Sequence, residues 1–364
     1  MGAAALTAGI FYLTAVTAGT DSAAAAFTAV VDSAPKGVLQ WELGDLWVRD
    51  DLSAAAVLTL AQSPLLRTAR REILWRAEEP QEEVAAKEGE ARVLEETPLV
   101  PEESGGSEAR TLVPSSEEGY VISGRAYITN TSDHTITEEE VSRPFAAQLG
   151  QGDPQILILH THGSESYTPP EEAKVVWSGD YRTTDTRYNV VAVGDVMAEV
   201  FGAAGISVLH DRTLYDYPSY NGAYDRSLAS IEDYLAHYPS IRFVLDLHRD
   251  AVEDTAGNQY RVICETQEGT AAQMTLVVGS DGGGLYHPNW QENLRLATAL
   301  QEHLLAENEQ LMRPVLLRNS RYNQHVTTGS LLVEVGAAGN SPEEAALAAR
   351  IFAEGMIDVI TGTG

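Results

Sequence analysis

Histidines and carboxylates follow or end three aliphatic runs in this chain of 364 residues. The polar positions are His160, His162 and Glu165 after ILIL, Asp246, His248, Arg249 and Asp250 in FVLDLHRDA, and Glu334 in LLVEVGAAGN. Each run is typical of a buried strand that ends at its polar residues. Because residues two apart in a strand share a face, we expect His160 and His162 to point together, with Glu165 following about one turn later.

These residue types are the ones that a catalytic zinc ion uses. Such an ion commonly takes two histidines and one carboxylate and leaves its fourth position to water, whose pKa falls to about 7. A further carboxylate can take the proton of that water and pass it to a leaving amine. Asp246 or Asp250 could orient a ligand histidine through its second ring nitrogen. A single histidine or glutamate at a strand end is usually an ordinary polar residue, so the residues alone leave a metal site and a solvated sheet edge both open.

The elements that must position these residues begin near residue 154, where strand-like and helix-like patterns start to alternate. The expected strands are QILILH, ISVLH, IRFVLDLH, QYRVICE, QMTLVVG, PVLLR and SLLVEVG. The expected helices are YNVVAVGDVMAEVFGAAG, SLASIEDYLAHY, NWQENLRLATALQEHLLAE and SPEEAALAARIFAEGMIDVI, the last with Ser341 as its N-cap. This alternation predicts an α/β fold, with a largely parallel sheet flanked by helices on both faces and sites at the carboxyl ends of the strands.

The chain before this domain divides into three predicted regions. Residues 1–30 are predicted to be a signal-anchor or signal-like segment, because residues 2–19 carry no charge and are long enough to cross a bilayer. No basic residue precedes them and AAAAF could fit a cleavage site, so anchored and released forms both stay open. Residues 31–76 are predicted to be a helical membrane-proximal region. Residues 77–119, rich in Glu, Pro, Gly and Ser, are predicted to be a disordered acidic linker before a globular domain at 120–364.

The composition narrows the class of partner. Asp and Glu outnumber Lys and Arg by 53 to 24, which gives a formal net charge of -29. A surface this acidic repels nucleic acid and anionic lipid headgroups, so we expect no nucleic-acid binding. Cys264 is the single cysteine, which excludes an intrachain disulfide, and its setting is typical of a small core residue.

Several motifs, in order, resemble the stage II sporulation protein P family over roughly residues 120–360. The matching stretches are HTHGSESYTP, YNVVAVGD, GISVLHD, SYNGAYDRS, YPSIRFVLDLHRDA, LVVGSDGGGLYHPNWQENLRLA and LLVEVGAAGNSPEEA. The resemblance implies a zinc-dependent cell-wall hydrolase of a spore-forming bacterium. Its fold would be a zinc amidase-like α/β catalytic domain.

The same resemblance implies a substrate and partners. Members of the family cleave the amide between N-acetylmuramic acid and L-alanine of the stem peptide, and some also cut peptide cross-links. They act during engulfment of the forespore with stage II sporulation proteins D and M. For this chain the resemblance therefore implies peptidoglycan as the substrate and Zn2+ as the cofactor. It also implies a catalytic domain outside the cell membrane, held by a single N-terminal span.

When the family's zinc ligands are matched to this sequence residue by residue, the resemblance implies that His248 is one ligand and that one histidine of HTH is another. His162 ranks above His160, because His162 with Gly163 resembles the GHGG turn of the broader zinc amidases.

The carboxylates and the arginine are carried over in the same way. Glu165 is favoured as the carboxylate ligand, and Asp185, just before RYNVV, is its rival. Glu334 matches the catalytic carboxylate, which acts first as general base and then as general acid. Arg249 could bind a substrate carboxylate or stabilise the oxyanion, or it could simply pair with Asp250.

Two other functions stay open. A zinc endopeptidase would use the same chemistry on an amide of the stem-peptide cross-link. A non-catalytic scaffold that binds the cell wall would need no metal-activated water, so the His and Glu set argues against it.

Overall fold

The computed structural model of the protein describes residues 107–170, 173, 175, 177–179, 181–255 and 257–363. The predicted segment 1–30, the helical region 31–76 and the first part of the predicted linker lie outside these residues. Across the described part of the chain, no helix combines the length and the apolar character needed to cross a membrane.

The last part of the predicted linker belongs to the folded domain. β1 (Ala109–Arg110) pairs in parallel with β9 (Arg261–Thr266), and Leu112 N donates to Gln273 Oε1 over 2.6 Å. The prediction of disorder up to residue 119 is therefore wrong at this end. The acidic composition of the whole linker concealed the short stretch ARTLV, which supplies β1 and the contacts of Thr111 and Leu112 with the domain.

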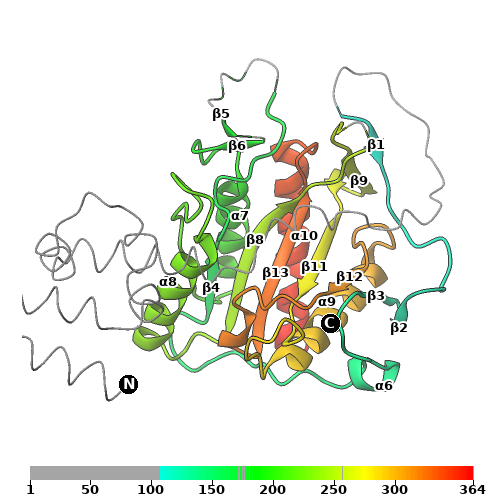
Figure 1. The fold of residues 1–364 in the computed structure, drawn as a ribbon, viewed down its shortest axis with the longest axis vertical. Coiled ribbons are helices and arrows are strands. Elements are labelled where there is room, and N and C mark those ends of the chain that lie inside the picture. The colour runs from blue at the N-terminus through cyan, green and yellow to red at the C-terminus, as the bar shows by residue number, and fades with distance from the viewer. Residues whose placement is uncertain are drawn as a thin grey trace, which may run out of the picture. The chain divides into compact units, whose positions relative to one another are not determined.

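An eight-stranded sheet forms the centre of the domain, in the order β2-β3-β12-β11-β13-β8-β4-β7 (Figure 1). In chain order its strands are β2 (Val121–Ser123), β3 (Ala126–Asn130), β4 (Ile156–Leu159), β7 (Val208–His210), β8 (Phe243–Asp250), β11 (Met274–Val278), β12 (Val315–Leu317) and β13 (Gly329–Ala337). Neighbouring strands are parallel except at β2–β3 and β11–β13. The predicted, largely parallel α/β sheet is thus confirmed, with an antiparallel junction that the alternation did not predict.

Helices cover both faces of this sheet, as predicted. α7 (Val190–Ala203), α9 (Trp290–Glu307) and α10 (Pro342–Thr361) pack on one face, where α7 and α10 lie side by side (Figure 1). α8 (Ala223–His237) packs on the other face. A short helix, α6 (Glu138–Val141), and the 3-10 helix η3 (Gln324–Val326) lie in connecting segments.

The side chains of β4 alternate between the two cores. Ile156 and Ile158 join the core that contains α7, and Leu157 and Leu159 pack in the core that contains α8. Both faces of the strand are therefore buried, which explains why its sequence is an unbroken aliphatic run rather than an alternation of apolar and polar residues.

The closing helix α10 begins where its sequence predicts. Ser341 Oγ accepts a hydrogen bond from Glu344 N, and the Glu344 side chain accepts one from Ser341 N, which makes a capping box. Pro342 occupies the first turn, and Gly362 ends the helix at φ 70°.

Two smaller sheets lie beside the main one. β9 is the middle strand of the first, between β1 and β10 (Gly269–Ala272). The second is the hairpin of β5 (Trp177–Gly179) and β6 (Arg182–Thr183). β6 matters for the site because it carries Arg182.

Candidate metal centre

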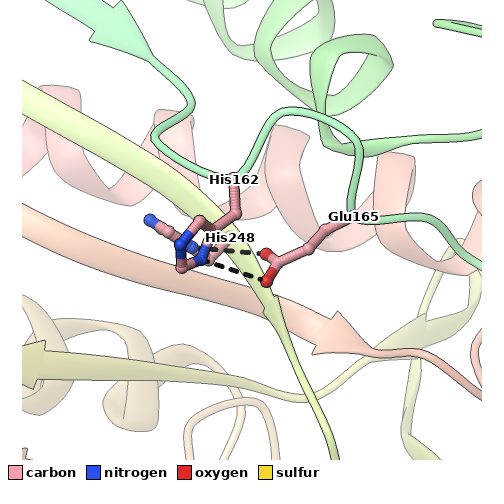
Figure 2. Close-up of side chains that lie close together, drawn as sticks. All are labelled: His162, Glu165 and His248. Atoms are coloured by element: carbon pink, nitrogen blue, oxygen red, sulfur yellow. Dashed lines mark ion pairs between the residues drawn. The ribbon is translucent and has the colours of Figure 1, made fainter. Parts of the chain in front are cut away.

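Three buried side chains, His162, Glu165 and His248, meet at the carboxyl ends of β4 and β8. Each offers one ligand atom, and these atoms all lie within 4.8 Å of one another. Glu165 Oε1 is 3.4 Å from His162 Nδ1, and Glu165 Oε2 is 3.2 Å from His248 Nδ1. Figure 2 shows the carboxylate joined to both rings. Within the described residues, this is the one group of three or more such side chains close enough to share an ion.

β8 presents His248 on the face of the sheet that α8 covers. Leu245 and Leu247 join the opposite core, so Asp246 and His248 share the α8 face. His248 Nε2 lies 3.1 Å from Asp246 Oδ1. Thr161 fixes that carboxylate by donating from N over 2.7 Å and from Oγ1 over 2.6 Å. Asp246 thereby orients the His248 ring, with Nδ1 directed toward Glu165.

A tight turn carries the other two members of the group. β4 ends at Leu159, residues 161–164 form a turn, and Glu165 N donates to His162 O over 3.0 Å. Ser164 anchors the turn by donating to the buried Asp216, from N over 3.0 Å and from Oγ over 2.5 Å. The turn, and not the strand, therefore brings His162 to the side of His248.

His160 lies apart from this group. Its Nδ1 is 3.2 Å from the Leu247 carbonyl oxygen and its Nε2 is 2.8 Å from His210 Nε2. The expectation that His160 and His162 point together is wrong, because the two-residue period ends with the strand at Leu159. Burial lowers the pKa of His160 to about 3, and the nearby His210 adds to the effect, so the His160 imidazole is neutral.

Asp185, the rival carboxylate, does not join the group either. Both its oxygens accept from Arg187, over 2.9 Å from Nε and over 2.6 Å from Nη2. These bonds hold the pKa of the Asp185 carboxyl below its ordinary value. The geometry places Glu165 beside the histidines, while the ligand assignment itself stays a prediction.

Glu334 lies on the strand next to His248. The two residues are register partners in the parallel pair β13–β8, so their side chains share a face of the sheet. Glu334 Oε2 is buried and accepts no hydrogen bond within the described part of the chain. Burial and the neighbouring Asp250 raise the pKa of Glu334 to about 8, although His248 acts in the opposite direction. A proton-carrying carboxyl therefore lies beside the candidate metal centre.

Arg249 holds together the segments around the group. Its Nη2 donates to the Tyr181 carbonyl over 3.0 Å, and its backbone N donates to Glu165 Oε2 over 3.3 Å. The Asp250 carboxylate pairs instead with Arg313, at 2.7 Å. This geometry gives Arg249 a positioning role for Glu165, a role that we did not anticipate from the sequence.

Three further residues at the centre were missed by the sequence analysis: Arg182, Asp216 and Tyr220. Arg182 Nη1 lies 2.6 Å from Asp216 Oδ2, and Arg182 Nη2 lies 3.4 Å from Glu165 Oε1. The Tyr220 ring stacks on His162 with 4.7 Å between centroids. Asp216 and Tyr220 lie in the segment before α8, and Arg182 lies on the two-residue strand β6. No strong periodic pattern marks such positions, and only the stretch SYNGAYDRS, noted for its resemblance, contains one of the three residues.

The donor set and its charges fit a zinc ion. Burial lowers the pKa of His248, but Asp246 and then Glu165 outweigh burial and raise it well above the ordinary value. Burial raises the pKa of Glu165, but hydrogen bonds from His162 and His248 outweigh it and hold the pKa well below the ordinary value. The chain thus stabilises a positive charge between two carboxylates, where a divalent cation could replace the proton.

Comparison with known proteins places the chain among sporulation proteins. The family described as stage II sporulation protein P (SpoIIP) matches residues 70–357. Stage II sporulation protein P of Bacillus subtilis (strain 168) is 28% identical over 220 residues, which cover 56% of this chain and 50% of that protein. The chain therefore spans about half the length of this curated relative.

Among solved structures, similarity is found to three N-acetylmuramoyl-L-alanine amidases. AmiC2 of Nostoc punctiforme is 14% identical with a TM-score of 0.36, over 58% of this chain and 99% of that chain. The catalytic domain of CwlV from Bacillus (Paenibacillus) polymyxa var. colistinus is 10% identical with a TM-score of 0.34, over 57% and 97%. The enzyme from Clostridium difficile 630 is 14% identical with a TM-score of 0.31, over 58% and 97%.

Proposed function

The chain belongs to the stage II sporulation protein P family, and from this premise we propose that it is a zinc-dependent peptidoglycan hydrolase that acts in sporulation. The bond that we propose it cleaves is the amide between N-acetylmuramic acid and L-alanine. The observation that carries this proposal is the buried group of His162, Glu165 and His248, with Glu334 on the adjacent strand.

In this proposal His162, Glu165 and His248 hold the zinc ion, and Asp246 keeps the His248 ring in place. Two histidines and one carboxylate are a ligand combination typical of catalytic zinc sites. A bound zinc ion supplies a Lewis acid and lowers the pKa of water, which provides a nucleophile at neutral pH. Arg249 keeps the Glu165 carboxylate directed at the group through its backbone N.

Glu334 is the residue that moves protons. As a carboxylate it accepts a proton from the attacking water, and as an acid it donates that proton to the departing alanine nitrogen. Its raised pKa of about 8 makes it a proton donor at neutral pH. A divalent cation held by His162, Glu165 and His248 would favour the carboxylate form of Glu334 and lower its pKa, so that Glu334 could also accept the proton at neutral pH.

Mass spectrometry of the products released from purified sacculi tests the proposal. An amidase leaves a new N-terminal alanine on the released stem peptides. New peptide ends within the cross-links would instead identify an endopeptidase. No release by the zinc-loaded chain would favour a scaffold that binds the cell wall without turnover, and would overturn the proposal.

Substitution of Glu334 tests its role in the same assay. Glu334→Gln keeps the size of the side chain but cannot accept the proton, so we expect hydrolysis to fall by about 100-fold or more. The zinc content should stay at the wild-type value, because Glu334 is not among the proposed ligands. Digestion of sacculi at the wild-type rate would exclude Glu334 as the base.

We also propose a location and partners. The charge-free stretch 2–19 supports an anchor within residues 1–30, with the folded domain, which includes β1, outside the cell membrane or released by cleavage. Family membership supports stage II sporulation proteins D and M as partners. Protease added outside intact protoplasts should digest the anchored domain, and full protection of the domain would contradict this location.

A further inference from the structure

One aromatic side chain connects the buried group to solvent. Tyr220 precedes α8 and stacks on the ring of His162, with 4.7 Å between centroids and 26° between planes. The same residue is 46% exposed. The guanidinium carbon of Arg182 lies 4.8 Å from the centroid of the Tyr220 ring. Tyr220 therefore offers a partly exposed aromatic surface beside His162 of the candidate metal centre.

The loop that carries Tyr220, residues 215–221, is anchored at both ends. Arg226 donates to the carbonyls of Tyr215 over 2.7 Å, Ser219 over 2.5 Å and Asn221 over 2.9 Å. Near its start, Asp216 is buried and accepts hydrogen bonds from the turn that carries His162. A loop fixed in this way loses little conformational entropy when a ligand settles on its exposed ring.

A second tyrosine, Tyr224 of α8, approaches the same histidine. Tyr224 lies 5.4 Å from His162 and 6.0 Å from Tyr322 between ring centroids. Tyr181 and Tyr322 have φ values of 49° and 48°, in the left-handed region that bulky side chains rarely adopt. Such backbone strain gathers at sites where the surrounding structure holds a residue for a purpose.

The charges around Tyr220 favour a neutral ligand. Arg182 is paired with the buried Asp216 at 2.6 Å and lies 3.4 Å from Glu165, so its charge is already balanced by two carboxylates. A sugar ring, which is uncharged and presents a face of C–H groups, suits a tyrosine ring better than an acidic peptide does.

We propose that Tyr220, with Arg182 beside it, is a subsite that holds an N-acetylhexosamine ring of the glycan strand next to the metal centre. The inference rests on the proposed function. It specifies that the sugar part of the substrate, and not the stem peptide, binds on the Tyr220 side of the metal centre. In the proposed substrate, the carbonyl to be attacked belongs to the lactyl group of the sugar. A sugar stacked on Tyr220 therefore brings that carbonyl close to His162.

The test measures binding without turnover. The whole 364-residue chain carrying Glu334→Gln is titrated with peptide-free glycan strands and, separately, with free stem peptides. Tyr220→Ala, added to this chain, should weaken glycan binding by about tenfold, which corresponds to about 1.4 kcal/mol. Tyr220→Phe keeps the ring and should bind as the parent does. Tyr238, 39% exposed and at the far end of α8, gives the matched control Tyr238→Ala, which should change nothing.

The outcomes separate the subsite from the proposed activity. Unchanged glycan binding by a folded Tyr220→Ala chain, with its thermal midpoint as the check on folding, would overturn the subsite. The subsite would also be overturned if Tyr220→Ala weakened only the binding of free stem peptides, because Tyr220 would then bind the peptide and not the sugar. If wild type releases nothing from sacculi while Tyr220 still governs glycan binding, the proposed hydrolysis fails and the sugar subsite stands.

Discussion

At the scale of single residues, two histidines separated by one threonine have opposite surroundings. His162 faces Glu165 and the candidate metal centre, whereas His160 contacts a backbone carbonyl and His210. Spacing alone could not distinguish them, because the difference depends on the residue at which β4 ends. Their neighbours in space, and not in sequence, decide which of them can reach an ion.

The zinc content of variants tests the proposed ligands. His248→Ala removes one of three ligands and should lower the zinc bound per chain by at least about tenfold, since loss even of a residue that only supports a ligand commonly costs that much. His237→Ala is the matched control, because His237 is an exposed histidine that contacts Asp233 and lies outside the group. Atomic emission spectrometry of the purified proteins gives the number of zinc ions bound per chain. A fully metallated His248→Ala chain would remove His248 from the ligand set.

The raised pKa of Glu334 makes the stability of the zinc-free protein depend on pH. Between the ordinary pKa of 4.5 and the folded-state value of about 8, the folded chain binds the Glu334 proton more tightly than the unfolded chain does. The free energy of unfolding should therefore fall as pH rises from 5 to 8, and Glu334→Gln should reduce that fall. Urea unfolding of the chelator-treated proteins at both pH values measures it. Equal slopes for the two proteins would contradict a raised pKa at this position.

Part of the site could be predicted because strand ends carry it. His248 and Glu334 end apolar runs, and the carboxyl ends of parallel strands meet at one edge of a sheet. Arg182 and Asp216 could not be predicted in this way, because neither ends a strand of the main sheet: Arg182 lies on the two-residue strand β6 of a separate hairpin, and Asp216 lies in the segment before α8. Only the folded chain brings these two residues together at 2.6 Å.

At the scale of elements, α7 approaches the sheet through a glycine. A Cβ atom added at Gly194 would lie 2.4 Å from His210 Nε2 and 2.8 Å from His160 Nε2, whereas one added at Gly202, in the same helix, would meet nothing within 4 Å. Gly194→Ala should destabilise the protein by about 1–3 kcal/mol through overpacking. Gly202→Ala should stabilise it by about 0.5 kcal/mol, because alanine favours a helix.

Chemical denaturation measures the free energy of unfolding of Gly194→Ala and Gly202→Ala, which lie in the same helix. A Gly194→Ala protein as stable as Gly202→Ala would show that α7 can move away from the histidine pair without cost. Wild-type stability for both variants would contradict the close approach of α7 to the sheet.

The order of the elements was largely predictable, but the antiparallel junction between β11 and β13 was not. Helices α7 and α8 connect β4, β7 and β8, which are parallel as the alternation predicts, and from the same alternation we predicted a largely parallel sheet. The segment 318–328, between β12 and β13, contains only the short η3 and no crossover helix. A parallel connection needs a crossover of about a dozen residues or more, usually helical, so this short connection was the available sign of a reversal.

At the scale of the whole molecule, β1 shows that the folded domain begins before the predicted boundary at residue 120. Deleting residues 77–106 should leave the release of peptides from sacculi unchanged, because no candidate site residue lies there. Deleting 77–119 should lower the thermal midpoint, because it removes β1 and the bonds between Leu112 and Gln273. Equal thermal midpoints for the two deletions would show that β1 contributes nothing to stability.

The position of β13 has a consequence for the order of events as the chain is made. β13 follows every other strand of the eight-stranded sheet in sequence, yet it lies in the middle of that sheet, between β11 and β8. Until residues 329–337 have been synthesised, β11 and β8 each present an edge with no neighbour, and the sheet exists at most as two separate halves. The nascent domain therefore cannot complete its fold as synthesis proceeds, and it has to be kept from aggregating until this late strand joins the two halves.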